Sequence, residues 1–194
     1  MEGHAMKNTL RLALAVLFCI VLCLGIGASA WAEGVAIDET NFPDQNFRNY
    51  VSANCDQDGD GTLSKSEIAA TTKFYLSSEN IYSLKGIEYF TSLQRLDCSW
   101  NKLTTLDLSS NIALTTLDCG GNYLTSLDVS GNTELASLSC YRNQLTSLNV
   151  SNNTALTTLG CSGNYLTSLD VSGNAALTSL NCGNNQLTSL DVSH

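Results

Sequence analysis

The chain has 194 residues, with 18 acidic and 9 basic side chains and a formal net charge of −9 at pH 7. A balance this acidic repels phosphate backbones, so nucleic acid is not an expected partner. It is compatible with a soluble protein that is exported from the cell.

Residues 1–32 have the pattern of a secretory signal peptide. A basic start is followed by an unbroken apolar run, residues 12–27, and by small residues around Ala30 and Ala32. The run is shorter than the roughly 20 apolar residues of a membrane span. We therefore predict cleavage after Ala32 or Ala30, with an uncleaved N-terminal anchor as the alternative. No membrane span is predicted once the signal is removed, and the expected location is extracellular or at a bacterial cell surface.

Residues 56–67, DQDGDGTLSKSE, place oxygen-bearing side chains at the spacing of a calcium-binding loop. Calcium prefers about six to eight oxygen ligands, which a twelve-residue loop supplies from positions 1, 3, 5, 7, 9 and 12. Glycine at position 6 permits the sharp turn of such a loop. The alternative is an acidic solvated turn, which has no need of a carboxylate at position 12. The candidate ligands are Asp56, Asp58, Asp60, Thr62, Ser64 and Glu67.

This loop resembles an EF-hand loop, and its spelling is similar to bacterial dockerin-type calcium loops. By that resemblance Thr62 would bind the ion through its backbone carbonyl, Ser64 directly or through a water, and Glu67 with both oxygens. Because EF-hand sensors and dockerins carry two loops and this chain carries one, a calcium switch is not expected. We predict calcium as a structural cofactor of an EF-hand-like module, residues 33–72.

The residues around the loop predict short helices. Residues 47–54 have apolar side chains at helical spacing, and a helix start is expected near Asp44. Residues 67–71 predict only a short helix after the loop. Residues 73–92 are interpreted as a transitional leucine-rich coil, because NIYSLKGIEYFTSLQRL, residues 80–96, resembles a longer internalin-like coil.

A leucine pattern recurs every 21 residues through residues 93–194. Each half-unit follows LxxLx(C/L/V)xxN, as in LTTLDCGGN at residues 114–122. Fixed self-similarity on this scale predicts a solenoid in which each repeat buries its apolar face against its neighbours. The pattern resembles short bacterial leucine-rich repeats of the form LxxLxCxxNxLxxLDLxxNxx. The expected fold class is a β-rich leucine-rich repeat solenoid, preceded by a small helical EF-hand-like cap.

A coil of 21 residues is too short for two strands and a crossover helix. We predict a parallel strand in the cysteine half of each repeat and an extended or strand-like segment in the valine half. Turns are expected at each asparagine, whose side-chain amide would satisfy backbone groups in the next coil. Neighbouring coils would then stack about 4.8 Å apart.

The repeat carries a cysteine at one inward position of every coil. We predict that these cysteines are small buried apolar side chains, since free cysteine is among the most buried residue types. Disulfide bonds or a metal ladder are the alternatives. Cys55, just before the acidic loop, has no evident partner. The five recurring cysteines are Cys98, Cys119, Cys140, Cys161 and Cys182.

No residues combine into a catalytic set. His4 belongs to the predicted signal peptide and His194 is the last residue, so no histidine is available in the folded body for base catalysis. Serine, threonine and aspartate recur at repeat positions, without a nucleophile, base and oxyanion site that belong together. The sequence therefore predicts a protein that is not an enzyme.

A binding surface is the remaining use of the repeat. The outward positions of the valine half hardly change, whereas those of the cysteine half vary from coil to coil. Tryptophan, tyrosine and arginine, which are common interface anchors, lie near that variable half. Incidental surface aromatics are the alternative. The predicted ligand-binding face consists of Arg95, Asp97, Trp100, Tyr123, Tyr141, Arg142 and Tyr165.

The predicted function is adhesin-like recognition of an extracellular protein or glycan at the cell surface or after secretion. The alternative is a structural or assembly fragment of a larger surface protein, with no ligand face of its own. The last half-repeat stops before its turn asparagine, so an unpaired edge is expected there. The expectation is either a longer array or self-association through that coil.

Overall fold

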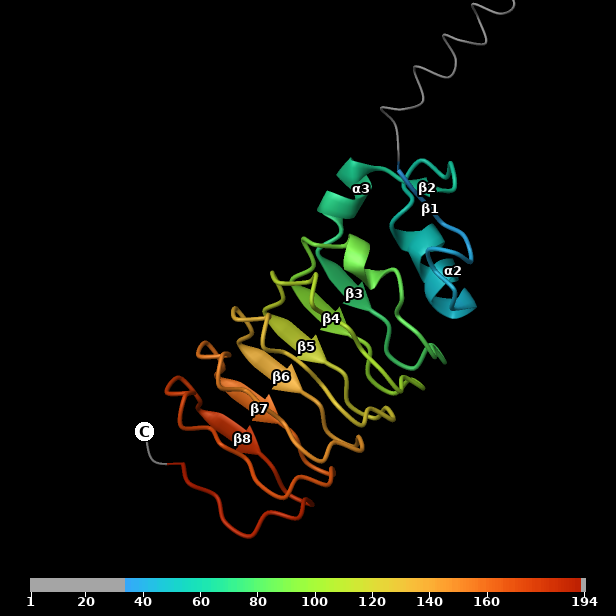
Figure 1. The fold of residues 1–194 in the computed structure, drawn as a ribbon. Coiled ribbons are helices and arrows are strands. Elements are labelled where there is room, and N and C mark those ends of the chain that lie inside the picture. Colours follow the sequence, from blue (N-terminus) through green and yellow to red (C-terminus); the bar gives the residue numbers. More distant parts are fainter. Residues whose placement is uncertain (1–33, 193–194) are drawn as a thin grey trace, which may run out of the picture. The chain divides into compact units, whose positions relative to one another are not determined.

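The computed structural model describes residues 34–192, and the predicted signal peptide lies outside them. The residues from Val35 onward pack as one compact unit, in which short helices come first and a stack of parallel coils follows (Figure 1). No helix in the described part of the chain is long and apolar enough to cross a bilayer.

Helix α2 (Gln45–Asn54) begins where the sequence predicts. The Asp44 carboxylate accepts hydrogen bonds from the backbone N–H groups of Asn46 and Phe47, at 2.9 and 3.0 Å. These are donors that the first turn of a helix leaves without an intrahelical partner. The expected helix start near Asp44 is confirmed.

Helix α3 (Lys65–Ala70) begins two residues earlier than predicted. The Ser64 hydroxyl accepts a hydrogen bond from the Glu67 N–H at 3.2 Å, and the Glu67 carboxylate accepts one from the Ser64 N–H at 2.8 Å. This capping box satisfies both donors and fixes the first turn. Strands β1 (Val35–Ala36) and β2 (Thr62–Leu63) form an antiparallel pair that the sequence did not predict.

One parallel sheet runs along the stack in the order β3-β4-β5-β6-β7-β8. From β4 onward, paired residues lie 21 positions apart, so that Leu96, Leu117 and Leu138 form a column. The predicted parallel strand of the cysteine half is observed in every coil. The valine half contributes no strand in residues 34–192 and consists of turns and extended backbone. The strands are β3 (Lys73–Tyr75), β4 (Arg95–Asp97), β5 (Thr116–Asp118), β6 (Ser137–Ser139), β7 (Thr158–Gly160) and β8 (Ser179–Asn181).

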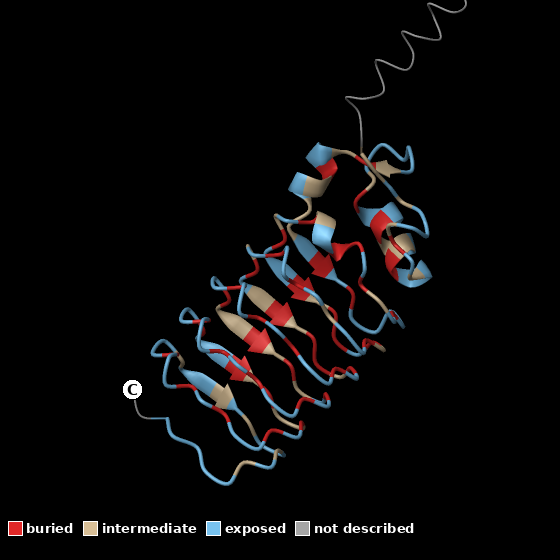
Figure 2. Cartoon of the chain, viewed as in Figure 1, coloured by how far each residue is buried: buried red, intermediate tan, exposed pale blue. Residues whose placement is uncertain are grey.

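The predicted transitional segment belongs to the same stack. Phe74 of β3 pairs with Leu96 of β4, and a 3-10 turn, η2 (Ile87–Tyr89), follows in the same coil. The inward side chains of the coils are buried, whereas most outward ones are exposed (Figure 2). Each buried leucine or valine contributes about 1.5–3 kcal/mol relative to exposure, so the stack is stabilised by one continuous apolar core.

Four phenylalanines join the helical segment to the first coil. The Phe74 ring packs edge-on against Phe90 and Phe47, with centroid distances of 4.8 and 5.8 Å. Asp44 also links the two parts, because its second carboxylate oxygen accepts a hydrogen bond from the Tyr82 N–H at 2.7 Å. The helical segment is therefore continuous with the stack. The fully buried phenylalanines are Phe42, Phe47, Phe74 and Phe90.

A first column of asparagines bonds neighbouring coils together. The side-chain nitrogen of Asn143 donates to the carbonyls of Cys119 and Cys140, at 3.0 and 3.1 Å, and its oxygen accepts from the Leu124 N–H at 3.0 Å. Cys119 and Leu124 lie in the preceding coil, whereas the sequence predicts partners in the next coil. The direction differs because the turn aims each amide back along the stack. The members are Asn101, Asn122, Asn143, Asn164 and Asn185.

A second asparagine column lies in the valine half and makes fewer hydrogen bonds. The side-chain nitrogen of Asn153 donates to the carbonyls of Val129 and Asn132, both at 2.9 Å. The side-chain oxygens of Asn111, Asn153 and Asn174 are buried without a hydrogen-bond partner among the described residues. An unpaired buried acceptor is costly unless water reaches it. The edge of each coil that carries the second column therefore has fewer hydrogen bonds between coils than the edge that carries the first.

The last described coil is more exposed than the coils before it. Leu190 and Val192 are 39% and 56% exposed, whereas the equivalent Leu169 and Val171 are 8% and 0% exposed. The inner coils are covered on both sides, and no further coil covers this end within the described residues.

The cysteine column is buried and unpaired. Cys98, Cys119, Cys140 and Cys161 are free thiols in the core, and Cys182 is a free thiol of intermediate burial. Burial raises the pKa of the Cys161 thiol to about 12, and it raises the pKa of the Cys119 thiol well above its usual value. The predicted role as buried apolar side chains is therefore observed for the inner four positions.

Replacing Asn143 with alanine is expected to lower the free energy of unfolding by about 2–3 kcal/mol, because the Leu124 N–H and two carbonyls lose their partner in the core. Replacing Asn153 is expected to cost about half as much, since its oxygen has no partner to lose. Urea unfolding followed by circular dichroism measures both, with the exposed Gln144→Ala variant as the control. Equal losses in the free energy of unfolding for the Asn143 and Asn153 variants would contradict the conclusion that the first asparagine column is bonded more completely than the second.

Alkylation tests the burial of the cysteine column. In the native protein at pH 8, a bulky maleimide is expected to label Cys182 first and to leave the four inner cysteines of the column unmodified, because the thiolate is the reactive form and burial suppresses it. Mass spectrometry of peptides after timed labelling gives the order. Prompt labelling of all five positions in the folded chain is the result that excludes this packing.

Candidate functional site

The acidic loop gathers three of the predicted calcium ligands. Carboxylate oxygens of Asp56, Asp58 and Asp60 lie within 4.8 Å of one another. The loop holds them there through its own backbone, because Asp56 accepts hydrogen bonds from the N–H groups of Gly59 and Gly61 at 2.9 and 3.0 Å. No lysine or arginine forms an ion pair with these carboxylates in the described part of the chain. Like charges this close repel by about 1 kcal/mol per pair in water.

Glu67 has a different environment from the three aspartates. One of its oxygens accepts a hydrogen bond from the Gln57 N–H at 2.6 Å, and the other accepts from the Ser64 N–H and hydroxyl at 2.8 and 2.7 Å. These bonds, led by the Ser64 hydroxyl, lower the pKa of Glu67 to about 2. The carboxylate therefore ties the start of the loop to its end.

Three of the residues predicted for the ligand face form one cluster. The rings of Trp100 and Tyr141 meet edge-to-face with centroids 6.0 Å apart, and the Arg142 guanidinium lies 5.5 Å from the Trp100 ring centre. Trp100 is 48% exposed. Aromatic rings and arginine in such contacts keep large, partly apolar surface in a fixed arrangement. We call these three residues the Trp100 cluster.

Two glycines make room for the Trp100 cluster. A Cβ atom added to Gly120 would overlap the Tyr141 ring, and one added to Gly121 would lie 2.8 Å from the Trp100 ring. Gly121 also has φ +66°, a left-handed conformation that favours glycine. The rings can therefore lie against the backbone of the intervening coil instead of extending into solvent.

Two partly buried carboxylates, Asp97 and Asp118, lie near the cluster. Burial raises the pKa of Asp118, the neighbouring Asp97 charge acts in the same direction, and a hydrogen bond from the Gly120 N–H opposes them. Burial and the Asp118 charge likewise raise the pKa of Tyr141.

The other predicted face residues make no ring or cation contact with this cluster in the described part of the chain. Arg95 is exposed on β4 and lies 5.8 Å from the Tyr75 ring centre. Asp97 accepts hydrogen bonds from the N–H and hydroxyl of Ser99, at 3.1 and 2.7 Å. Tyr123 and Tyr165 are exposed in the turns that follow β5 and β7. The predicted face therefore extends over strand β4 and the turns that follow the strands, with one tight cluster in it.

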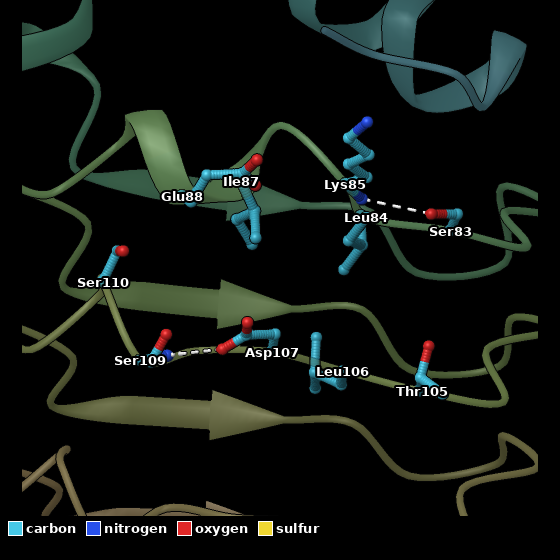
Figure 3. Close-up of a pocket in the computed structure, with 10 residues that line it drawn as sticks. All are labelled: Ser83, Leu84, Lys85, Ile87, Glu88, Thr105, Leu106, Asp107, Ser109 and Ser110. Atoms are coloured by element: carbon cyan, nitrogen blue, oxygen red, sulfur yellow. Dashed lines mark hydrogen bonds between the residues drawn. The ribbon is translucent and has the colours of Figure 1, made fainter. Parts of the chain in front are cut away.

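Sequence reasoning missed a hollow on the other half of the coils. A cavity of about 360 Å³ is lined by two segments, residues 83–88 and 105–110 (Figure 3). Asp107 lies at its wall, held by a hydrogen bond from the Ser109 N–H at 3.0 Å, and the Lys85 side chain points away from it (Figure 3). The hollow is formed between two coils, so no motif in either segment alone predicts it. Its groups do not converge on a common point.

The comparisons with known proteins agree with this architecture. The family described as Leucine Rich repeats (2 copies) matches residues 154–194. Internalin J of Listeria monocytogenes serotype 4b (strain F2365) is 44% identical over 70 residues, which are 36% of this chain and 8% of that protein. The chain thus spans a small part of the length of this relative.

Solved structures extend the likeness to most of the chain. The functional domain of internalin J from Listeria monocytogenes, which includes a cysteine ladder, matches with a TM-score of 0.78 and 42% identity over 83% of this chain and 36% of that one. An internalin, InlF, of strain 4b F2365 has the same fold, with a TM-score of 0.74, 23% identity and coverages of 81% and 48%. A leucine-rich repeat protein of Leptospira interrogans matches with a TM-score of 0.60, 27% identity and coverages of 65% and 35%. In its stacked coils and its column of buried cysteines, this chain is similar to the leucine-rich repeat structure of internalin J.

Proposed function

We propose that this chain is a secreted or cell-surface bacterial binding protein, whose turns present a recognition face to an extracellular protein or glycan. Residues 1–32 support export, because they have the charge, length and small-residue pattern of a signal peptide. The likeness to internalins supports a surface role, with the partner left to experiment. A binding role also accounts for variation at outward positions of one half of the coil while the inward positions stay constant.

The Trp100 cluster is the observation that carries this proposal. Trp100, Tyr141 and Arg142 are of the types that most often supply binding energy at interfaces. Their contacts with one another fix their rotamers before any partner arrives, so little conformational entropy is lost on binding. Arg142 and Trp100 remain exposed, although a surface tryptophan without a partner leaves apolar area in water. A protein interface or the apolar face of a sugar covers such an area.

A structural calcium in the loop of residues 56–67 is the second part of the proposal. The three clustered aspartates suit the ion, because hard oxygen ligands and uncompensated negative charge are what calcium prefers. Thr62 would add its backbone carbonyl, and Ser64 its hydroxyl directly or through a water. Glu67 would exchange its present hydrogen bonds with Gln57 and Ser64 for the ion. The bound ion would fix an EF-hand-like helix-loop-helix beside the first coil.

Substitutions in the Trp100 cluster test the recognition face. Alanine at Trp100 or at Tyr141 is expected to weaken binding to the partner by about tenfold or more, since each removes an anchor with its packed neighbour. The parent chain is first screened by biolayer interferometry against extracellular matrix proteins, mucin and polysaccharides. Ile112→Ala is the control, because Ile112 is 60% exposed but lies in the valine half. Ligands that bind both cluster variants as tightly as the parent would exclude this face.

Calcium titration tests the loop. Millimolar calcium is expected to raise the free energy of unfolding by about 1–2 kcal/mol, and a chelator should reverse the effect, because an ion that binds only the folded loop stabilises it. Asp58→Asn and Glu67→Gln are expected to lose this response. Asp128→Asn, which removes an exposed acid from the solenoid, should keep it. Isothermal titration should give one site per chain, and a parent chain whose stability ignores calcium would refute the assignment.

A further inference from the structure

The turns that follow the strands repeat over two coils rather than one. Residues 114–134 and 156–176 are nearly identical, and both contain the turn sequence Gly-Asn-Tyr, whereas residues 135–155 between them contain Arg-Asn-Gln. In chain order the turns read WNK, GNY, RNQ, GNY and NNQ. Glycine therefore occupies the first position of every second turn, and tyrosine occupies the third position of the same turns. The surface has a longer period than the core.

Packing explains the glycines in this alternation. Trp100 has φ 55°, and its ring covers Gly121. Arg142 has φ 49°, and a Cβ atom added to Gly163 would lie 3.4 Å from the Arg142 Cγ. Because neighbouring coils are only about 4.8 Å apart, a large side chain cannot lie flat in this column on every coil. The close approach of the Trp100 ring accounts for glycine at position 121, and the positive φ of Gly121 and Gly163, +66° and +69°, favours glycine at both positions.

Packing does not explain the tyrosines. Tyr123 and Tyr165, which we call the tyrosine row, are 53% and 52% exposed. Their N–H groups donate to the carbonyls of Leu103 and Leu145 at 2.9 and 2.8 Å, so the two residues have equivalent places in successive pairs of coils. Within residues 34–192, neither ring contacts another ring or a cation, and neither hydroxyl forms a hydrogen bond. They lie two coil spacings apart, with one coil between them, which corresponds to about 10 Å.

The two Gly-Asn-Tyr turns that hold the tyrosine row contain no charged residue. The turns contain no acidic residue, although the chain has a net charge of −9. The two basic residues of the neighbouring turns lie against rings, since Lys102 is 4.8 Å from the Tyr82 ring centre and Arg142 is 5.5 Å from the Trp100 ring centre. Gln144, at the equivalent position of the coil between the two tyrosines, is exposed, and so are Thr125 and Thr167, two residues after each tyrosine.

We propose that the tyrosine row binds an extended, neutral β-1,4-linked polysaccharide along the axis of the coils. The proposal rests on the proposed recognition function and names its ligand class. A tyrosine ring packs against the C–H face of a sugar, while nearby amides and hydroxyls bond its hydroxyl groups. Alternate sugars of such a chain present the same side, so the ligand, like this surface, repeats every two units. Two equivalent contacts on one polymer then reinforce each other through effective concentration.

The test compares oligosaccharide length with tyrosine substitution. Binding of cellohexaose and chitohexaose to the purified chain is measured by isothermal titration, beside the corresponding disaccharides. The hexasaccharides are expected to bind more tightly than the disaccharides, because only they reach both rings. Tyr123→Ala and Tyr165→Ala should each weaken hexasaccharide binding by about tenfold. Tyr123→Phe should retain binding, because the ring remains.

The control is Tyr75→Ala, which removes a 54% exposed tyrosine outside the turns and should leave binding unchanged. Circular dichroism verifies that each variant folds. Equal affinity of the parent and the Tyr123→Ala variant for hexasaccharides, or no binding of either sugar, overturns the proposal. Salt-sensitive binding of a uronate-containing polymer in place of the neutral sugars also overturns it. If a ligand instead depends on Trp100 and ignores both tyrosines, the recognition function stands and the polysaccharide assignment falls.

Discussion

The hydrogen bonds between one coil and the next are the constraint on which the rest of this structure depends. Short strands of three residues cannot satisfy the backbone of a whole coil, so the turns need another source of donors and acceptors. The first asparagine column supplies it, because each amide bonds carbonyls of two coils and an N–H of the preceding one. A coil with one residue more or fewer would move its asparagine out of line and leave buried groups unpaired. The fixed spacing of the leucines and cysteines follows from that requirement.

The regularity of the core concentrates chemical variety in the turns. Inward positions must repeat, since each leucine and cysteine packs against its own equivalent in the neighbouring coils. Outward side chains at the turns escape this restriction, but they are limited by the narrow spacing of the coils. Trp100 therefore requires glycine at position 121, and Tyr141 requires glycine at position 120, although the two members of each pair belong to different coils. A larger residue at either glycine would therefore displace a ring of the Trp100 cluster.

Period and polarity made the coils, the parallel strands, the buried cysteines and the helix start at Asp44 predictable. Each of these depends on contacts within one repeat or between identical repeats. The β1–β2 pair was not predictable, because two-residue strands carry no periodic signal. The direction of the asparagine amides and the role of Gly120 depend on the path of the chain one coil away. The same is true of the cavity beside Asp107, whose two walls come from different coils. In the acidic loop, the spacing of the aspartates predicted their clustering, whereas the pairing of Glu67 with Gln57 depends on how the loop closes.

The phenylalanine cluster also determines where the alignment of the stack begins. Residues 114–134 and 156–176 are so alike that a slip by two coils would replace most side chains with identical ones, at little local penalty. No phenylalanine follows Phe90 in the sequence, so the aromatic pocket formed with Phe47 of α2 accepts only one coil. That pocket therefore fixes which coil of the repetitive chain comes first in the stack. A shifted register is excluded at the first coil, and each following coil then pairs in register with the coil before it.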